Sequence, residues 1–301
     1  DRTDPRSPGM TAPVPPLPLP PVSEPFRLPF HYGALHQIGL DWLVAPGPVR
    51  ELLAKHHPDL TAAAFEDGRA LVSLNYQLYF AQYAFGGGVT QEIEFSVVAF
   101  PSGAEGRLPR LSYAQYAQGW DQTKLLGIAR VHVVCDNPFA IRAGRELYAE
   151  PKHPGRFEVD LPSLNGPSGE TWSVRCKAAA IGADDSLEQD LGPLVGLTAE
   201  LDGLVPAVAN SAPITGYGTD LEGRLLAGPM NVYQPYRWYD LAAPEHAGRA
   251  RLAVHAPESD LGRDVLDLVG DETPATGAWT YQSPPVAAHN RPYYVPAAAR
   301  P

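Results

Sequence analysis

The sequence predicts a mainly β, α+β fold with a few peripheral helices, and three observations support this prediction. The 301-residue chain has 33 prolines and 28 glycines spread along its length, which favours many short elements joined by turns. Segments rich in β-branched and aromatic residues recur between glycine-containing turns. Segments with helical periodicity are few and short.

The N-terminal segment, residues 1–25, is too rich in proline for a helix or a sheet ladder, so we expect a disordered or polyproline II tail there. Residues 26–301 show no internal repeat and no convincing boundary, which predicts a single domain. A short surface helix is expected over 48–57, because a proline begins it and Val49, Leu52 and Leu53 recur at helical spacing.

Strands are predicted in three parts of the chain. Residues 71–80 and 92–100 are expected to pair around a turn at residues 86–88, and residues 129–136 form a further apolar strand. In residues 171–180, apolar and polar side chains alternate, which is typical of a strand with one buried face. Near the C-terminus, strands over 249–257 and 278–284 flank a helix over 260–269.

A helix between residues 138 and 150 has boundaries that are evident from its sequence. Asn137 can cap it, Pro138 suits its first position, and Pro151 prevents a further turn. Lys152 follows directly, held between Pro151 and Pro154. A lysine there can simply interact favourably with the helix dipole, or it can be a positioned nucleophile, and the periodicity leaves both explanations open.

Composition excludes several classes of function. The net charge is −11 without a basic stripe, so nucleic acid is not an expected partner. No apolar stretch approaches the roughly 20 residues of a membrane span and no signal peptide opens the chain, so we expect no membrane partner and a cytoplasmic protein. Cys135 and Cys176 lie in apolar segments and are expected to be buried thiols. No nucleotide-binding or metal motif occurs, so no cofactor and no metal are predicted.

The segment from Asp136 to Asp160, DNPFAIRAGRELYAEPKHPGRFEVD, resembles the acetoacetate decarboxylase superfamily. Its hallmarks in this sequence are Asp136 and Asn137, then Gly144, Arg145 and Glu146 on the helix, then Pro151 and Lys152 at its end. Weaker similarity extends from about residue 26 to residues 251–282. The resemblance implies an antiparallel β-barrel with peripheral helices, and a homo-oligomer.

The resemblance also implies that Lys152 attacks a carbonyl carbon to form a Schiff base. An ordinary lysine has a pKa of about 10.4 and is almost fully protonated near neutrality, so the pKa of Lys152 is expected to be lowered, mainly by burial in an apolar cavity. The family's catalytic glutamate matches Glu92, for positioning or proton transfer, although Glu94 faces the same side of an extended strand and is an alternative.

The sequence departs from the family pattern around this lysine. His153 stands where relatives have a second lysine, and the segment FHYGALHQIG lacks the family's arginine, leaving His31 and His36 as the nearest polar candidates. Asn75, with Gln77 beside it, stands where the family has an acidic residue. Tyr148 lies one helical turn before Lys152, where it either projects into the cavity or packs. We therefore expect His36, Asn75, Gln77 and Tyr148 to contact the substrate.

The resulting functional hypothesis is a lyase that acts on a small keto acid or related carbonyl compound through Lys152. Decarboxylation and aldol–dehydration chemistry both fit the resemblance. The alternative is a protein of the same fold that binds or cyclises its ligand without a Schiff base, as in secondary metabolism. The two differ in whether a keto acid becomes covalently attached to Lys152.

Overall fold

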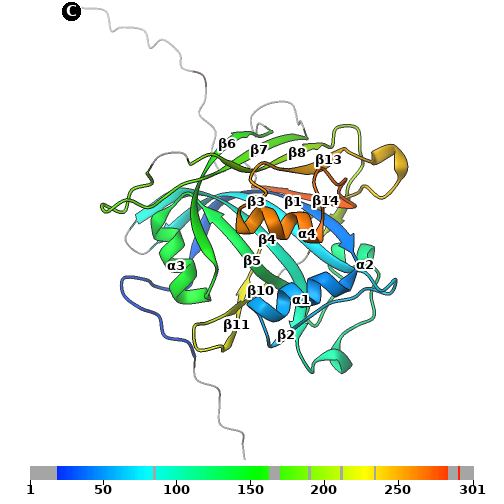
Figure 1. Cartoon of the computed structure of the whole chain (residues 1–301), viewed down its shortest axis with the longest axis horizontal. Coiled ribbons are helices and arrows are strands. Elements are labelled where there is room, and N and C mark those ends of the chain that lie inside the picture. The colour runs from blue at the N-terminus through cyan, green and yellow to red at the C-terminus, as the bar shows by residue number, and fades with distance from the viewer. Residues whose placement is uncertain are drawn as a thin grey trace, which may run out of the picture.

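The computed structural model describes residues 19–83, 86–162, 170–188, 191–210, 213–233, 235–283 and 291. Within them, fourteen strands form one mixed sheet with four α-helices around it (Figure 1). The mainly β, α+β class is therefore confirmed. The strands are β1 His31–Val44, β2 Leu60–Ala62, β3 Ala70–Tyr83, β4 Gly86–Pro101, β5 Gly127–Cys135, β6 Lys152–Asp160, β7 Thr171–Ala178, β8 Pro193–Glu200, β9 Ala207–Ala209, β10 Ile214–Thr219, β11 Leu225–Met230, β12 Tyr236–Asp240, β13 Ala250–Val254 and β14 Gly277–Gln282.

The helices are α1 Pro46–His56, α2 Tyr113–Ala117, α3 Pro138–Tyr148 and α4 Asp260–Leu268. Short 3-10 turns occur at Glu105–Arg107 and Pro244–His246. In Figure 1, α1, α3 and α4 lie on the near side of the sheet. No helix in the described ranges is long and apolar enough to cross a membrane.

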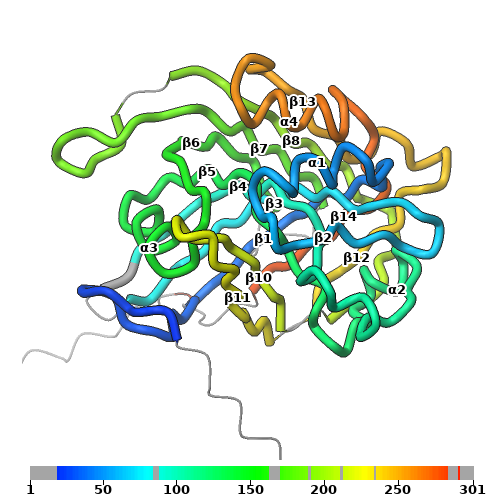
Figure 2. Tube along the Cα trace, turned by 60° about the horizontal axis from the view of Figure 1, so that its bottom comes forward, coloured from blue at the N-terminus to red at the C-terminus, as the bar shows by residue number. Residues whose placement is uncertain are grey.

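The strands follow the order β13-β8-β7-β6-β5-β4-β3-β1-β14-β12-β9, with β2 on β4 and the β10–β11 hairpin on β5. Among the described strands no pairing closes this path, so closure into a barrel stays a prediction. The pairs β5–β6 and β5–β10 are parallel, which corrects the expectation of a wholly antiparallel sheet. The β10–β11 hairpin lies beside α3 (Figure 2).

The central strands β1, β3 and β4 are buried on both faces. One face packs in the main core, which includes Ile38, Leu74 and Phe95 and receives α1 and α4 through Val49 and Val265. The other face carries a row of buried polar residues between apolar ends. The register places them in successive rungs across β1, β3 and β4, namely Gln37–Gln77–Glu92, Gly39–Asn75–Glu94 and Asp41–Ser73–Ser96, in which Gly39 has no side chain and Ser73 is half-buried. We call this row the polar stripe.

Most of the predicted elements are present with small shifts in their bounds. The expected turn at residues 86–88 is wrong, because these glycines are the first residues of β4 and pair with the end of β3. The sequence predicts no strand directly after the helix, yet Lys152 is the first residue of β6. Of the predicted tail, residues 1–18 lie outside the described residues, and residues 19–25 form neither helix nor strand.

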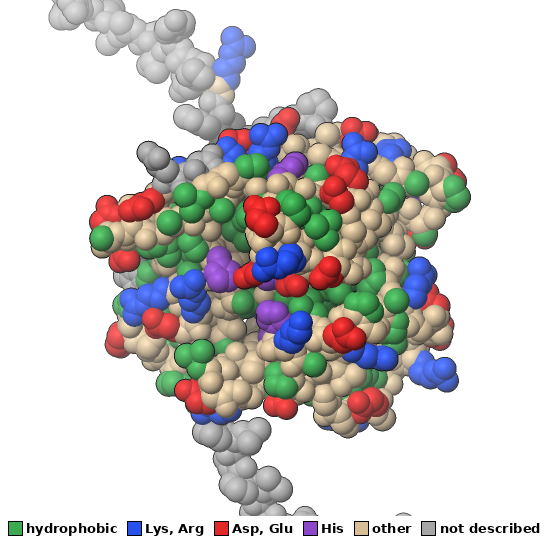
Figure 3. Space-filling model, viewed as in Figure 1, with side chains coloured by type: hydrophobic (Ala, Val, Ile, Leu, Met, Phe, Trp, Pro, Cys, Tyr) green, Lys and Arg blue, Asp and Glu red, His purple; other side chains and the backbone are tan. Residues whose placement is uncertain are grey.

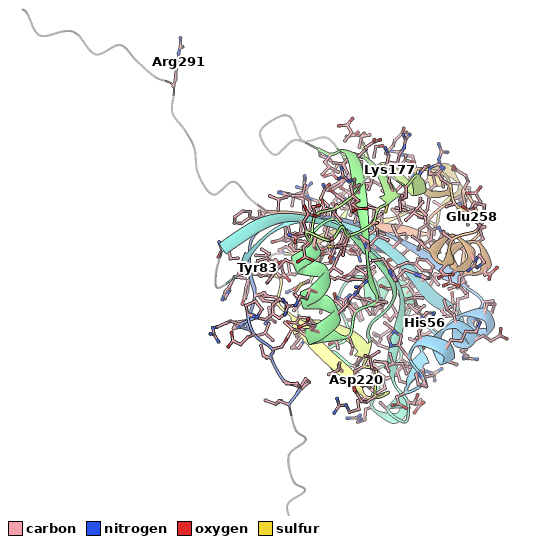
Figure 4. The ribbon with its side chains drawn as sticks, turned by 60° about the vertical axis from the view of Figure 1, so that its left-hand side comes forward. His56, Tyr83, Lys177, Asp220, Glu258 and Arg291 are labelled. Carbon is pink, nitrogen blue, oxygen red and sulfur yellow. The ribbon has the colours of Figure 1, made fainter. Side chains whose placement is uncertain are left out.

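The surface carries charges of both signs. On the face shown in Figure 3, acidic and basic side chains are interspersed and no basic stripe is present. Tyr83, at the end of β3, lies beside α3 (Figure 4), and its ring packs on Phe139 with centroids 4.7 Å apart.

Candidate active site

Helix α3 and strand β6 position Lys152. The Asn137 side chain caps α3 by accepting hydrogen bonds from the backbone N–H groups of Phe139 (2.9 Å) and Ala140 (3.3 Å), as predicted. The helix ends at Ala149, whose φ of 52° is left-handed. The chain then reverses, and Lys152 enters β6 beside Val133 of the parallel strand β5. The Arg145 guanidinium donates a hydrogen bond to the Lys152 carbonyl oxygen (2.8 Å), which fixes this junction.

Gly144 makes room for the lysine side chain. A Cβ atom at this position would lie 2.6 Å from Lys152 Cε and 2.5 Å from Glu150 Oε2, closer than real Cβ contacts allow. The absence of a side chain at Gly144 therefore lets α3 approach both residues. This contact explains why the predicted hallmark places a glycine two turns before the lysine.

The Lys152 ammonium group lies between two carboxylates. Its Nζ is 2.9 Å from Glu92 Oε2 and 3.2 Å from Glu150 Oε2, and the whole residue is 6% exposed. The hydroxyl of Tyr79 donates to the same Glu92 oxygen (3.1 Å). The structure thus brings together the predicted pair Lys152 and Glu92. Glu150 and Tyr79 complete the group.

Burial and ion pairing have opposite effects on these groups. Burial alone would lower the pKa of Lys152, but Glu150 and Glu92 outweigh it and raise that pKa well above its ordinary value. The predicted decrease in the pKa of Lys152 is therefore wrong, because two carboxylates lie beside the ammonium group and the sequence predicted only burial in an apolar cavity.

The two carboxylates differ in their own protonation. Burial raises the pKa of Glu92 by more than Lys152 lowers it. For Glu150 burial acts in the same direction, yet Lys152 and Arg130 together lower its pKa. Two carboxylates whose pKa values shift in opposite directions beside one amine can serve different purposes, one exchanging a proton and the other remaining a charged partner of the ammonium group.

A network of buried hydrogen bonds extends from this pair along the polar stripe. Arg130 lies 2.8 Å from Glu94 Oε1 and 3.5 Å from Glu150 Oε1. Asn75 donates to Glu94 (3.3 Å) and accepts from Gln37 (3.2 Å). Glu94 therefore shares the face of Glu92 but pairs with Arg130, which settles which of the two glutamates meets the lysine.

The other predicted contact residues lie at different distances from this centre. Asn75 belongs to the network, and Gln77 pairs in register with Glu92 on the same face. Tyr148 is half-buried, and its ring packs where a side chain at Gly228 would stand. His36 follows the alternation of β1 and faces away from the side that Gln37 occupies, so it is not brought to the network. His31 is exposed at the start of β1.

The remaining hallmark residues support the site from outside. Asp136 accepts hydrogen bonds from the backbone N–H (2.8 Å) and side chain (3.2 Å) of Gln91, the neighbour of Glu92. Glu146 is on the surface, where it pairs with Arg142 (2.7 Å). His153 has a pKa lowered first by burial and then by Arg145, so it supplies no cation to the lysine. Cys135 and Cys176 are free, buried thiols, as predicted.

Sequence reasoning missed Glu150, Tyr79 and Arg130. Glu150 offered a signal, because it stands two residues before Lys152 in the segment AEPK. Tyr79 and Arg130 offered none, since only the sheet register brings them to the site.

The fold is shared with solved structures. The enduracididine biosynthesis enzyme MppR, in complex with the condensation product of pyruvate and imidazole 4-carboxaldehyde, aligns with a TM-score of 0.52 at 14% identity over 91% of this chain and 94% of its own. MppR in complex with pyruvate aligns with a TM-score of 0.53 at 13% identity over 88% of both chains. This chain has the acetoacetate decarboxylase-like fold.

The resemblance predicted from residues 136–160 is thus confirmed for the fold. An acetoacetate decarboxylase from Legionella pneumophila subsp. pneumophila str. Philadelphia 1 also aligns, with a TM-score of 0.47 at 12% identity over 91% of both chains. No family model matches the sequence, and a search of the curated proteins found no match either.

Proposed function

We propose that this protein is a Schiff-base-forming lyase that acts on a keto acid through Lys152, by decarboxylation or by aldol and dehydration steps. The observation that carries the proposal is the buried Lys152 ammonium group between Glu92 and Glu150. The fold is shared with MppR, whose complexes with pyruvate and with a pyruvate condensation product support a carbonyl compound as the substrate.

In the proposed reaction Glu92 accepts a proton from the Lys152 ammonium, which leaves a free amine. The amine nitrogen bonds to the carbonyl carbon, and the carbonyl oxygen leaves as water with one proton from the amine and the proton held by Glu92, giving a protonated imine. This iminium withdraws electrons, so carbon dioxide or a proton departs from the adjacent carbon without its bonding pair. The resulting enamine carbon then takes a proton through Glu92, either the proton that Glu92 removed from the same carbon or, after loss of carbon dioxide, a proton that Glu92 takes from water. Water finally hydrolyses the iminium and releases the product and Lys152.

A second function, binding without covalent chemistry, is supported by a specific observation. The two carboxylates raise the pKa of Lys152, and a protonated amine cannot attack a carbonyl. If the protein only binds its ligand, the Lys152 ammonium group serves as a positive charge that recognises the ligand. The two proposals differ in whether a bond forms between lysine and ligand.

Reductive trapping distinguishes them. The protein is incubated with acetoacetate, pyruvate or a larger keto acid, reduced with borohydride and mapped by peptide mass spectrometry. We expect a reduced adduct on Lys152 that is lost in Lys152→Ala and kept in Lys55→Ala, a lysine on the surface helix α1. A folded wild-type protein that gives no adduct with any keto acid would favour noncovalent binding. Turnover that survives in Lys152→Ala would show chemistry without a Schiff base.

The proposal includes finer features, some implied by the family resemblance and some by the sequence composition. These are closure of the sheet into a barrel, a single domain over residues 26–301, a cytoplasmic location and a homo-oligomer. Light scattering coupled to size-exclusion chromatography measures the number of copies in the particle. A monomeric mass would contradict the proposed homo-oligomer.

A further inference from the structure

A cavity lies on the same face of the sheet as Lys152, at the opposite end of the polar stripe. It contains about 930 Å³ of space outside any atom, part of it open to solvent. Its walls are largely apolar and aromatic, with Tyr236, Trp238 and Trp279 among the lining residues. Asn75 also lines it and connects it to Glu94, whereas Lys152, Glu92 and Glu150 do not line it. The cavity is therefore separate from the lysine site but adjoins its network.

The polar rung Asp41–Ser73–Ser96 lines this cavity. Asp41 is buried and accepts hydrogen bonds from the Tyr113 hydroxyl (2.8 Å) and from the Trp279 indole N–H (3.3 Å). No Lys, Arg or His of the described segments forms an ion pair with it. Burial raises the pKa of Asp41 to about 6, so it is mostly ionised near neutrality. The cavity wall thus holds a negative charge without a counter-ion.

Ser96 provides a second and independent indication of a ligand. Its hydroxyl oxygen is buried and has no hydrogen-bond partner, and the residue is only 2% exposed. Buried polar groups are nearly always paired in folded proteins. A hydroxyl left unpaired on the wall of a cavity is suited to receive a polar group of a ligand.

The remaining charged groups of the cavity are already engaged or lie at its edge. Asp121 accepts hydrogen bonds from the backbone N–H groups of Thr123 (2.9 Å) and Leu126 (3.0 Å). Lys124 also lines a neighbouring, open hollow with Gln118 and Trp120, which places it toward the mouth. Asp41 therefore sets the charge that a bound molecule meets among the aromatic rings.

We propose that this cavity binds a small organic amine in its cationic form, with the ammonium group at Asp41 and Ser96 and an apolar or aromatic body against Trp238, Trp279 and Tyr236. A buried carboxylate favours a cation over a neutral or anionic ligand. Aromatic faces favour a cation as well. Tyr116 and Lys124, from the segment between β4 and β5, line the cavity, and Tyr113 of the same segment donates the hydrogen bond to Asp41.

Three probes of similar shape and different charge test the proposal. Benzylamine, benzyl alcohol and benzoate are titrated near neutral pH, with tryptophan fluorescence and calorimetry as readouts, because two tryptophans line the cavity. We expect benzylamine to bind about tenfold or more tightly than benzyl alcohol, and benzoate to bind weakest. Benzyl alcohol or benzoate binding as tightly as benzylamine, or no binding of benzylamine up to its solubility, would overturn the proposal. These comparisons use the wild-type chain and need no variant to fold.

Variants then locate the charge. Asp41→Asn is expected to remove the preference for benzylamine over benzyl alcohol, whereas Asp59→Asn, an exposed aspartate after α1, is expected to keep it. A preference that survives in folded Asp41→Asn would place the amine elsewhere and overturn the assignment. An amine cannot form an imine with a lysine, so this result is independent of the proposed reaction at Lys152.

Discussion

At the scale of single residues, the charge of Lys152 depends on its two carboxylate neighbours. Burial disfavours an ammonium, but contacts of 2.9 and 3.2 Å with Glu92 and Glu150 favour it more strongly. The free amine that the proposed chemistry needs must therefore arise by proton transfer within the site. Glu92 is the suitable acceptor, since burial raises its pKa.

Glu150→Gln should make Lys152 a better nucleophile near neutrality. The amide no longer stabilises the ammonium, so the pKa of Lys152 falls and the fraction of free amine rises, while Arg130 keeps its 2.8 Å contact with Glu94. The rate of borohydride-trapped adduct formation, measured against pH, should shift to lower pH than in the wild type. The exposed Glu146→Gln on α3 is the control, and coincident profiles for wild type and Glu150→Gln would contradict the assigned role.

Glu92→Gln should slow proton transfer at the carbon next to the keto group. A proton carrier at the enamine carbon contributes about 10² to 10⁴-fold, so hydrogen–deuterium exchange next to the keto group should slow by that factor. Nuclear magnetic resonance of the keto acid in deuterated water measures it. Glu94→Gln, two residues along the same face but paired with Arg130, should change the exchange only a few-fold. Equal losses in both folded variants would contradict a specific role for Glu92.

Part of this site was predictable from residues alone. The motif identified Lys152, and the resemblance identified Glu92 as its partner. The charge of the lysine was not predicted, because Glu150 reaches it only through the left-handed turn at Ala149. Tyr79 and Arg130 reach the site through pairing between distant strands, for which the local sequence carries no signal.

At the scale of elements, α3 is the part that the sequence predicts best. Its cap at Asn137, its first residue Pro138 and its end before Pro151 all follow local rules. The strand that follows was missed, because β6 pairs in parallel with β5 only after the helix has crossed over. Pro151 and Pro154 flank Lys152, and prolines are uncommon within sheets, so the local sequence does not indicate a strand there.

Gly144→Ala tests the contact between α3 and the lysine. Alanine is the better helix former, so α3 itself should not be weakened. The new Cβ would stand 2.6 Å from Lys152 Cε, so the side chain must move away from Glu92. We expect a folded protein with far-ultraviolet circular dichroism like the wild type and adduct formation slowed about tenfold or more. Glu146→Ala, on the exposed side of the same helix, should leave the rate unchanged, and a Gly144→Ala variant with the wild-type rate would refute this role.

At the scale of the whole molecule, β1, β3 and β4 are apolar on one face and polar on the other, and both faces are buried. The sequence shows the alternation, for instance Gln37 and Asp41 among Ile38, Leu40 and Trp42, but polar positions in a strand ordinarily face water. The polar stripe becomes visible only when the sheet register aligns its rungs. This is why the site lysine was predictable and the cavity around Asp41 was not.

The buried Asp41 carboxylate should make stability depend on pH. Its pKa is raised to about 6 in the folded chain and is about 3.9 when unfolded, so between about pH 4 and 6 the folded state binds the extra proton and stability falls as pH rises. The full cost at neutral pH is about 3 kcal/mol. Its titratable neighbours Tyr113 and Tyr116 keep their protons there, because burial raises their pKa.

Asp41→Asn should remove this dependence, because an amide does not ionise but still accepts the Tyr113 hydrogen bond. Urea unfolding at about pH 4 and about pH 7 measures the free energy of unfolding of the variant and of the wild type. We expect the free energy of the variant, relative to that of the wild type, to be higher at pH 7 than at pH 4 by up to about 3 kcal/mol. Asp59→Asn is the exposed control. If the difference in free energy of unfolding between variant and wild type is the same at both pH values, the Asp41 charge does not destabilise the fold. A gain, in contrast, would show that the fold keeps a carboxylate at the expense of its own stability, as expected of a group retained for a cationic ligand.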